Sequence, residues 1–150
     1  VFKRDNSNEE FNEGMDLTVC VVYHKEKKIE FAGAMNDLFV IRDNDILTFH
    51  GDRHSIGTNS TLGEIDEKQY RSHTIECQSG DMFYMFSDGY YDQFGGNDGL
   101  KMKTKKFKEI LLQCTLKSNE EQMKILENEF IAWKGSYEQV DDMLILGIQI

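Results

Sequence analysis

Two pairs of short apolar segments, each pair joined by a tight polar turn, constrain the fold of this chain more than any other feature. In the first pair, β-branched and apolar residues fill Leu17–Tyr23, charged residues follow at Lys25–Lys28, and a second apolar run ends at Gly33. Strand-forming runs bounded by turn residues in this way predict a β-hairpin. Because the chain contains no proline, its turns depend on Gly, Asn and Asp.

The second pair has the same form. Leu38–Ile41 and Ile46–Phe49 flank the turn residues Asp43–Asp45, which tolerate tight backbone angles, and together they predict a second hairpin. The polar stretch Gly51–Asp66 contains several glycines and predicts a loop that crosses a sheet or lines a cleft.

Two more strands and then two helices are expected. The strands are Tyr70–Cys77 and Met82–Phe86, with the sequence QSGD as their turn. One face of the first helix is given by Phe107, Ile110, Leu111 and Cys114. The second helix has Ser118 as N-cap, Glu121 to complete a capping box, and Gly135 as its stop. Its apolar stripe, which we assign to the core, is Met123, Leu126, Phe130 and Trp133.

The chain ends in the acidic and then apolar sequence QVDDMLILGIQI, which predicts an interior strand. This order of elements indicates an α+β fold with helices packed on a mostly antiparallel sheet. Residues 1–150 are expected to form a single domain. Because nothing in the sequence covers the second face of the sheet, we interpret this domain as the later part of a larger one.

Composition restricts the possible partners. The formal net charge is −10, so nucleic-acid binding is disfavoured, and divalent cations or basic protein surfaces are the expected partners. No apolar run approaches the length of a membrane span, and the polar start does not resemble a signal peptide. The three cysteines are odd in number and lie far apart in apolar patterns, which favours a reducing, intracellular location.

Acidic residues stand where two predicted strands meet their turns. Asp88 follows one strand and Asp141 precedes another, so the two could meet at one edge of a sheet. Carboxylates of this kind suit Mg²⁺ or Mn²⁺, but acidic residues at strand ends are also common as solvated turn formers. The loop that contains Asp88 and Asp92 does not fit the EF-hand calcium template, because it lacks the required third and sixth residues.

Several motifs in series resemble one family. GMDLTVCVVY, FAGAMNDLFVIR, GDRHSIG, GDMFYMFSDGYYDQFGG and QVDDMLILGI are similar, in order and spacing, to the C-terminal half of the catalytic domain of SpoIIE/RsbU-like phosphatases. These bacterial enzymes belong to the metal-dependent PPM class of serine/threonine phosphatases. The resemblance implies part of an α-β-β-α sandwich. It also implies metal binding by Asp88 and Asp141, with Gly89 allowing close backbone approach and Asp142 shaping the turn or contacting metal-bound water.

The resemblance further implies two Mn²⁺ or Mg²⁺ ions that activate a water for attack on a phosphoserine or phosphothreonine, without a side-chain nucleophile. The implied substrate is a phosphoprotein such as an anti-sigma-factor antagonist. An upstream sensor or regulatory domain and a cytoplasmic location are also implied.

The chain departs from the family pattern in ways that affect this expectation. It lacks the G-D-[FY] and D-x-x-G-H-G-like segments that supply further metal ligands, so its metal site should be incomplete and the chain alone inactive. The alternative is a non-catalytic remnant that acts as a protein-interaction module. Asp37 and Ser55 replace residues that are often proline in the family. Arg53 could bind phosphate, or could form an ion pair with a carboxylate such as Asp52 or Glu64.

Overall fold

The computed structural model describes residues 14–57 and 70–150, and their strands form two main antiparallel sheets. The first sheet has the order β1-β2-β5. It contains β1 (Leu17–Tyr23), β2 (Lys28–Ala34) and β5 (His73–Glu76). The first predicted hairpin is confirmed, with Leu17 opposite Ala34 and Tyr23 opposite Lys28.

The second sheet has the order β4-β3-β6-β9. It contains β3 (Leu38–Arg42), β4 (Asp45–Phe49), β6 (Met82–Phe86) and β9 (Ile145–Gln149). The second predicted hairpin is also confirmed. Asp43 and Asn44 have positive φ angles of 49° and 63° in its turn, which is a conformation that Asn and Asp adopt more readily than most residues.

Both predicted helices are present, as α1 (Lys103–Gln113) and α2 (Asn119–Lys134). The capping box of α2 forms: the Glu121 N–H donates to Ser118 Oγ at 3.3 Å, and the Ser118 N–H donates to Glu121 Oε2 at 2.9 Å. Gly135 ends the helix with a φ of 54°. In the part of the chain that is described, neither helix has the length and apolar character needed to cross a membrane.

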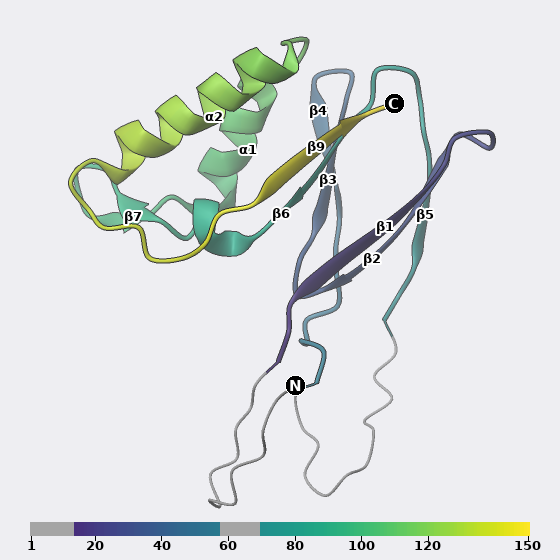
Figure 1. Cartoon of the computed structure of the whole chain (residues 1–150), viewed down its shortest axis with the longest axis horizontal. Helices are drawn as coiled ribbons and strands as arrows, with labels where there is room; N and C mark the ends of the chain where they lie inside the picture. Colours follow the sequence, from purple (N-terminus) through teal and green to yellow (C-terminus); the bar gives the residue numbers. More distant parts are fainter. Residues whose placement is uncertain (1–13, 58–69) are drawn as a thin grey trace, which may run out of the picture.

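The elements form three layers, with the second sheet between the helices and the first sheet (Figure 1). Alternate residues of each strand point to opposite faces, so β3 supplies both interfaces. Phe39 and Ile41 pack with Phe107 of α1 and Phe130 of α2. The other face of β3, which contains Leu38 and Val40, packs against β2 and β5 through Ile29, Phe31 and Ile75. This layering is the fold class that the sequence predicted.

Two details of the prediction are wrong. The last strand, β9, is not interior: among the described strands it pairs only with β6 and lies at the sheet edge, and Leu146 is 47% exposed. In α2, Met123 is 63% exposed, and the neighbouring Gln122 is buried in its place. The side-chain oxygen of Gln122 accepts a hydrogen bond from Tyr84 Oη at 2.7 Å, which satisfies both buried polar groups. The rest of the predicted α2 stripe packs on the helix-side core.

The loop between β4 and β5 is described only as far as Gly57, and the remainder of the predicted loop lies outside the described residues. A short 3-10 helix, η1 (Asp88–Tyr90), follows β6. After it comes a small hairpin of β7 (Phe94–Gly95) and β8 (Leu100–Lys101), which leads into α1. The turn at η1 directs the chain from the sheet edge toward the helices.

Candidate metal centre

The end of β6 and the start of β9 lie side by side where the strands of the second sheet end; below, this end of the sheet is called the site edge. These strands are antiparallel, and Phe86 is opposite Ile145. Ser87 joins the two segments just beyond this pair. Its hydroxyl donates to the Asp142 carbonyl oxygen at 2.9 Å and accepts from the Leu144 N–H at 2.9 Å. Its own N–H donates to the Leu144 carbonyl oxygen at 3.0 Å. Ser87 therefore fixes the segment that carries Asp88 against the segment that carries Asp141 and Asp142.

Gly89 permits a close approach between these segments. A Cβ at this position would lie 2.4 Å from the Asp142 carbonyl oxygen and 3.3 Å from the carbonyl carbon of Asp141. A Cβ atom essentially never lies within 3.0 Å of a non-bonded heavy atom, so a side chain here would push η1 away from β9. The glycine is buried and its role is steric, since it brings the residues around Asp88 next to Asp141.

The surroundings of Asp88 are acidic. Burial raises the pKa of the Asp88 carboxyl above its ordinary value, and the nearby carboxylates of Asp141, Asp92 and Asp16 raise the pKa further. Loss of hydration and nearby like charges both disfavour the ionised carboxylate. A bound cation would have the opposite effect, because it would favour the ionised form of every member of this group.

The Asp141 side chain is held locally. Its Oδ1 accepts the Asp142 N–H at 2.7 Å, and the Gln139 side-chain amide donates to the Asp141 carbonyl oxygen at 2.8 Å. Gln139, Val140, Asp141 and Asp142 line a shallow depression on the surface. Both aspartates are exposed. The Asp141 carboxylate is thus accessible from solvent and partly oriented by its own backbone.

The donor chemistry suits a hard divalent cation, although the number of donors is small. Carboxylate oxygens are preferred ligands of Mg²⁺ and Mn²⁺, and Mg²⁺ retains several waters when a protein supplies only a few oxygens. Within residues 14–57 and 70–150, no group of three or more His, Cys, Asp or Glu side chains has an arrangement that could hold a metal ion. A metal ion held by Asp88 and Asp141 would therefore need further ligands from elsewhere.

Asp92 differs from Asp88 although both lie in the same turn. Its Oδ2 is 2.5 Å from Lys101 Nζ, and its N–H donates to the Asp88 carbonyl oxygen at 2.9 Å. Lys101 offsets the Asp92 charge, and the backbone bond is typical of a turn. These contacts agree with the interpretation of Asp92 as a turn residue beside the site.

Three residues near the site were not singled out from the sequence. Asp16 contributes to the acidic surroundings of Asp88 and accepts a hydrogen bond from Ser55 Oγ. Ser87 provides the bonds described above, and its position between a strand and the Asp-Gly pair was the available signal. Tyr91 is partly buried: its pKa is raised to about 12, mainly by burial and then by Asp88, Asp92 and Asp37, whereas Arg53 lowers it.

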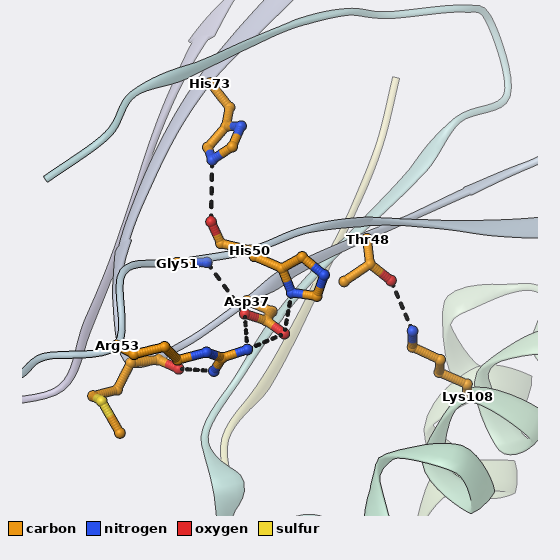
Figure 2. A network of polar contacts seen from close by, with 8 residues as sticks. Asp37, Thr48, His50, Gly51, Arg53, His73 and Lys108 are labelled. Atoms are coloured by element: carbon orange, nitrogen blue, oxygen red, sulfur yellow. Dashed lines mark hydrogen bonds and ion pairs between the residues drawn. The ribbon is translucent and has the colours of Figure 1, made fainter.

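The ion pair of Arg53 is not one that the sequence suggested. Asp52 pairs with Arg71, with 2.8 Å between Arg71 Nε and Asp52 Oδ1, and Glu64 lies outside the described residues. Arg53 pairs instead with Asp37, with 3.2 Å between Nη2 and Oδ1. Figure 2 shows Asp37 between Arg53, His50 and the backbone N–H of Gly51. No pattern in the sequence indicates that these loop residues meet.

Solved structures share this fold. The SiaA-PP2C domain of Pseudomonas aeruginosa superposes with a TM-score of 0.79 at 24% identity, covering 90% of this chain and 51% of that one. The phosphatase domain of SpoIIE from Bacillus subtilis, presoaked with Mn, gives 0.62 at 20% identity, with 90% and 56% covered. RsbX in complex with magnesium gives 0.56 at 16% identity, with 89% and 55% covered.

The chain thus spans about half the length of these structures. No curated protein matches it with significant similarity. The sequence profile of the family described as Stage II sporulation protein E (SpoIIE) matches residues 3–150, which is nearly the whole chain. The chain therefore belongs to the SpoIIE family.

Proposed function

We propose that this chain is the C-terminal part of the catalytic domain of a metal-dependent serine/threonine protein phosphatase, in which Asp88 and Asp141 are metal ligands. The observation that carries the proposal is the contact between η1 and the start of β9. There Ser87 and Gly89 hold two acidic segments together although mutual repulsion opposes it. A fold that keeps like charges together in this way is typical of a metal or catalytic site.

Each residue has a role in this proposal. Asp88 and Asp141 donate carboxylate oxygens to Mn²⁺ or Mg²⁺. Gly89 allows the two segments to approach, and Asp142 shapes the turn through the bond between its carbonyl and Ser87. When bound, two metal ions supply an activated water and stabilise the charge on the transferring phosphoryl group. The remaining ligands would come from outside the described residues.

The substrate and setting follow from the same proposal. The substrate is a phosphoserine or phosphothreonine protein such as an anti-sigma-factor antagonist, and a sensor or regulatory domain precedes the catalytic domain. The acidic surface favours basic or metal-bridged partners over nucleic acid. The described cysteines Cys20, Cys77 and Cys114 are all free thiols, which supports a cytoplasmic setting for signal transduction.

A second candidate function is a protein-interaction module without catalytic activity. It is favoured by the small number of candidate ligands among the described residues and by the apolar side chains exposed on β1, where Val19 is 47% and Val21 is 45% exposed. A remnant of this kind would keep the fold and the acidic corner but would not need a complete metal site.

Hydrolysis of a phosphoserine peptide by the natural-length protein distinguishes the two functions. We expect turnover that requires Mn²⁺ or Mg²⁺ and that falls by orders of magnitude in Asp88→Asn and Asp141→Asn, because a neutral amide is a poor ligand for a hard cation. Asp92→Asn is the matched control in the same turn and should have a mild effect. Equal losses in Asp88→Asn and Asp92→Asn would show that the ligand is misassigned, and unchanged activity in Asp88→Asn would refute the proposed site.

A further inference from the structure

Arg53 lies at the site edge, as the two candidate ligands do, although it belongs to a different loop. Strands β3 and β6 are antiparallel, with Phe39 opposite Tyr84. Two residues further along this register, Asp37 is level with Phe86, the last residue of β6. Strand β4 also ends at this edge, since Leu38 is opposite Phe49. The turn that carries Arg53 therefore begins at the same end of the sheet as the turn that leads to Asp88, with β3 between β4 and β6.

Two acceptors hold the Arg53 guanidinium in this position. Nη1 donates to the Met35 carbonyl oxygen at 3.0 Å, and Nη2 donates to Asp37 Oδ2 at 3.3 Å. The Asp37 carboxylate is itself fixed, because it accepts the Gly51 N–H at 3.2 Å and lies 3.1 Å from His50 Nδ1. Only 15% of the Asp37 side chain is exposed, whereas the Arg53 side chain is 62% exposed (Figure 2). A shielded carboxylate thus holds an accessible cation.

The guanidinium retains donors for a ligand. Arginine has five N–H donors, and the contacts described for Arg53 use the two terminal nitrogens. Nε and the second N–H of Nη1 are without a contact among the residues that the structure describes. The exposed guanidinium therefore keeps N–H groups available for the oxygens of a phosphate, to which it can donate charge-assisted hydrogen bonds.

The carboxylates at the site edge create a need for a nearby cation when a phosphate binds. The carboxylates of Asp16, Asp88, Asp92 and Asp141 repel a doubly negative phosphate monoester, so a cationic donor beside them favours its binding. Ser55, two residues after Arg53, donates a hydrogen bond to Asp16, and Asp16 belongs to the acidic surroundings of Asp88, so the loop of Arg53 borders the acidic group. Lys101 is engaged with Asp92 at 2.5 Å. Arg53 is therefore an accessible cation at this end of the sheet that keeps N–H donors available.

We infer that Arg53, oriented by Asp37 and the Met35 carbonyl, binds the phosphoryl group of the substrate at the edge of the Asp88–Asp141 site. This inference deepens the proposed phosphatase function and rests on it. Arg53 is the contacting residue, while Asp37 is a positioning residue that acts through Arg53.

Direct binding of inorganic phosphate tests the inference without requiring turnover. The natural-length protein with Mn²⁺ is titrated with inorganic phosphate by equilibrium dialysis, and the Kd is compared among variants. We expect Arg53→Ala to weaken phosphate binding about tenfold or more, and Arg53→Lys to weaken it about threefold because charge remains but the paired donors are lost. Asp37→Asn should weaken binding about threefold, since Arg53 remains but is less firmly oriented.

Lys28→Ala is the matched control, because Lys28 is also paired with a carboxylate, at 3.0 Å from Glu30, and lies at the opposite end of β2 from the site. Its Kd for phosphate should stay within about twofold of the parent, as should the Mn²⁺ affinity of every variant, because none of these residues is a metal ligand. A purely structural role for Arg53 would lower the melting temperature or the Mn²⁺ affinity and would not be partly rescued by Arg53→Lys.

The outcomes separate this inference from the proposed function. A parent that binds phosphate through Arg53 but does not hydrolyse phosphopeptides would refute the phosphatase activity and support the phosphate site. A parent that hydrolyses phosphopeptides while Arg53→Ala binds phosphate equally well would support the activity and overturn the phosphate site. Absence of phosphate binding by the parent would overturn it as well. If Arg53→Ala raises the KM for a phosphopeptide but not for p-nitrophenyl phosphate, Arg53 contacts the peptide and the inference is wrong.

Discussion

The substitution Gly89→Ala tests whether the close contact between η1 and β9 matters for the site. The added Cβ would lie 2.4 Å from the Asp142 carbonyl oxygen, so the two segments must separate by at least about 0.6 Å to reach even the tightest ordinary contact of 3.0 Å. The Ser87 hydroxyl bonds of 2.9 Å on either side oppose this separation. Overpacking of this kind costs about 1–3 kcal/mol of unfolding free energy.

The effect on activity should exceed the effect on stability. Moving Asp88 away from Asp141 by more than half an ångström changes the geometry of any metal ion that both carboxylates bind, and a misplacement near 1 Å costs about a hundredfold in rate. We therefore expect Gly89→Ala to lower the turnover of a phosphoserine peptide between about tenfold and a hundredfold at saturating Mn²⁺. Affinity for Mn²⁺ should fall as well.

Gly135→Ala supplies a control that loses stability without touching the site. Gly135 has a φ of 54° at the end of α2, and a Cβ there would have no heavy atom within 4 Å. The ψ of Gly135, −123°, lies outside the left-handed helical region, so alanine in this conformation costs about 1–3 kcal/mol through backbone strain alone. Both variants are compared in the natural-length protein by urea unfolding, Mn²⁺ titration and turnover. The reasoning is refuted if Gly89→Ala loses no more activity than Gly135→Ala.

Two other predictions concern the acidic corner. The 150-residue chain alone should hydrolyse p-nitrophenyl phosphate with Mn²⁺ at a negligible rate, because its described residues form no group of three or more side chains that could hold a metal ion; robust metal-dependent turnover by this chain would contradict that view. The pKa of Asp88 is raised in the folded chain, so the stabilising contribution of its protonated form is complete below the unfolded pKa and is lost as the pH rises through the folded pKa. The metal-free protein should therefore lose some unfolding free energy as the pH rises over this interval, and Asp88→Asn should lose less. Urea unfolding at a series of pH values measures both. An identical pH dependence of the two proteins would argue against burial and repulsion at Asp88.

Features set by neighbouring residues could be predicted from the sequence. The turn at Asp43 and Asn44 depends on residues that accept positive φ, and the start of α2 depends on Ser118 and Glu121, which bond to each other's backbone. Such interactions span a few residues, so the sequence contains nearly all the information that determines them.

Features set by distant residues were harder to predict. The apolar run in β9 indicates a strand, but apolar character does not show how many neighbours a strand has, and β9 lies at an edge. Likewise, helical periodicity in α2 does not fix its rotation. Tyr84 requires an acceptor for its buried hydroxyl, and Gln122 supplies it where Met123 was expected to face the core.

In the candidate site too, local features could be predicted from the sequence, whereas contacts between distant residues could not. The Asp-Gly pair after β6 and the two aspartates before β9 were visible as acidic turns, and the family resemblance gave Asp88 and Asp141 their expected role. Their approach across 53 positions depends on sheet pairing and on the missing side chain of Gly89. The pair between Arg53 and Asp37 depends on the path of two loops, which no local pattern specifies.

Lys101 explains why two aspartates of one turn should behave differently. It lies 2.5 Å from Asp92, so part of the Asp92 charge is already offset, and an exposed pair of this kind contributes about 0–1 kcal/mol to stability. Burial and nearby carboxylates both raise the pKa of Asp88, and its described electrostatic neighbours are mainly carboxylates. A divalent cation therefore gains more from binding at Asp88, where it relieves both burial and repulsion, than at Asp92, where it would compete with Lys101. This difference in charge environment, rather than the number of acids in the turn, is the physical reason to expect the metal at Asp88.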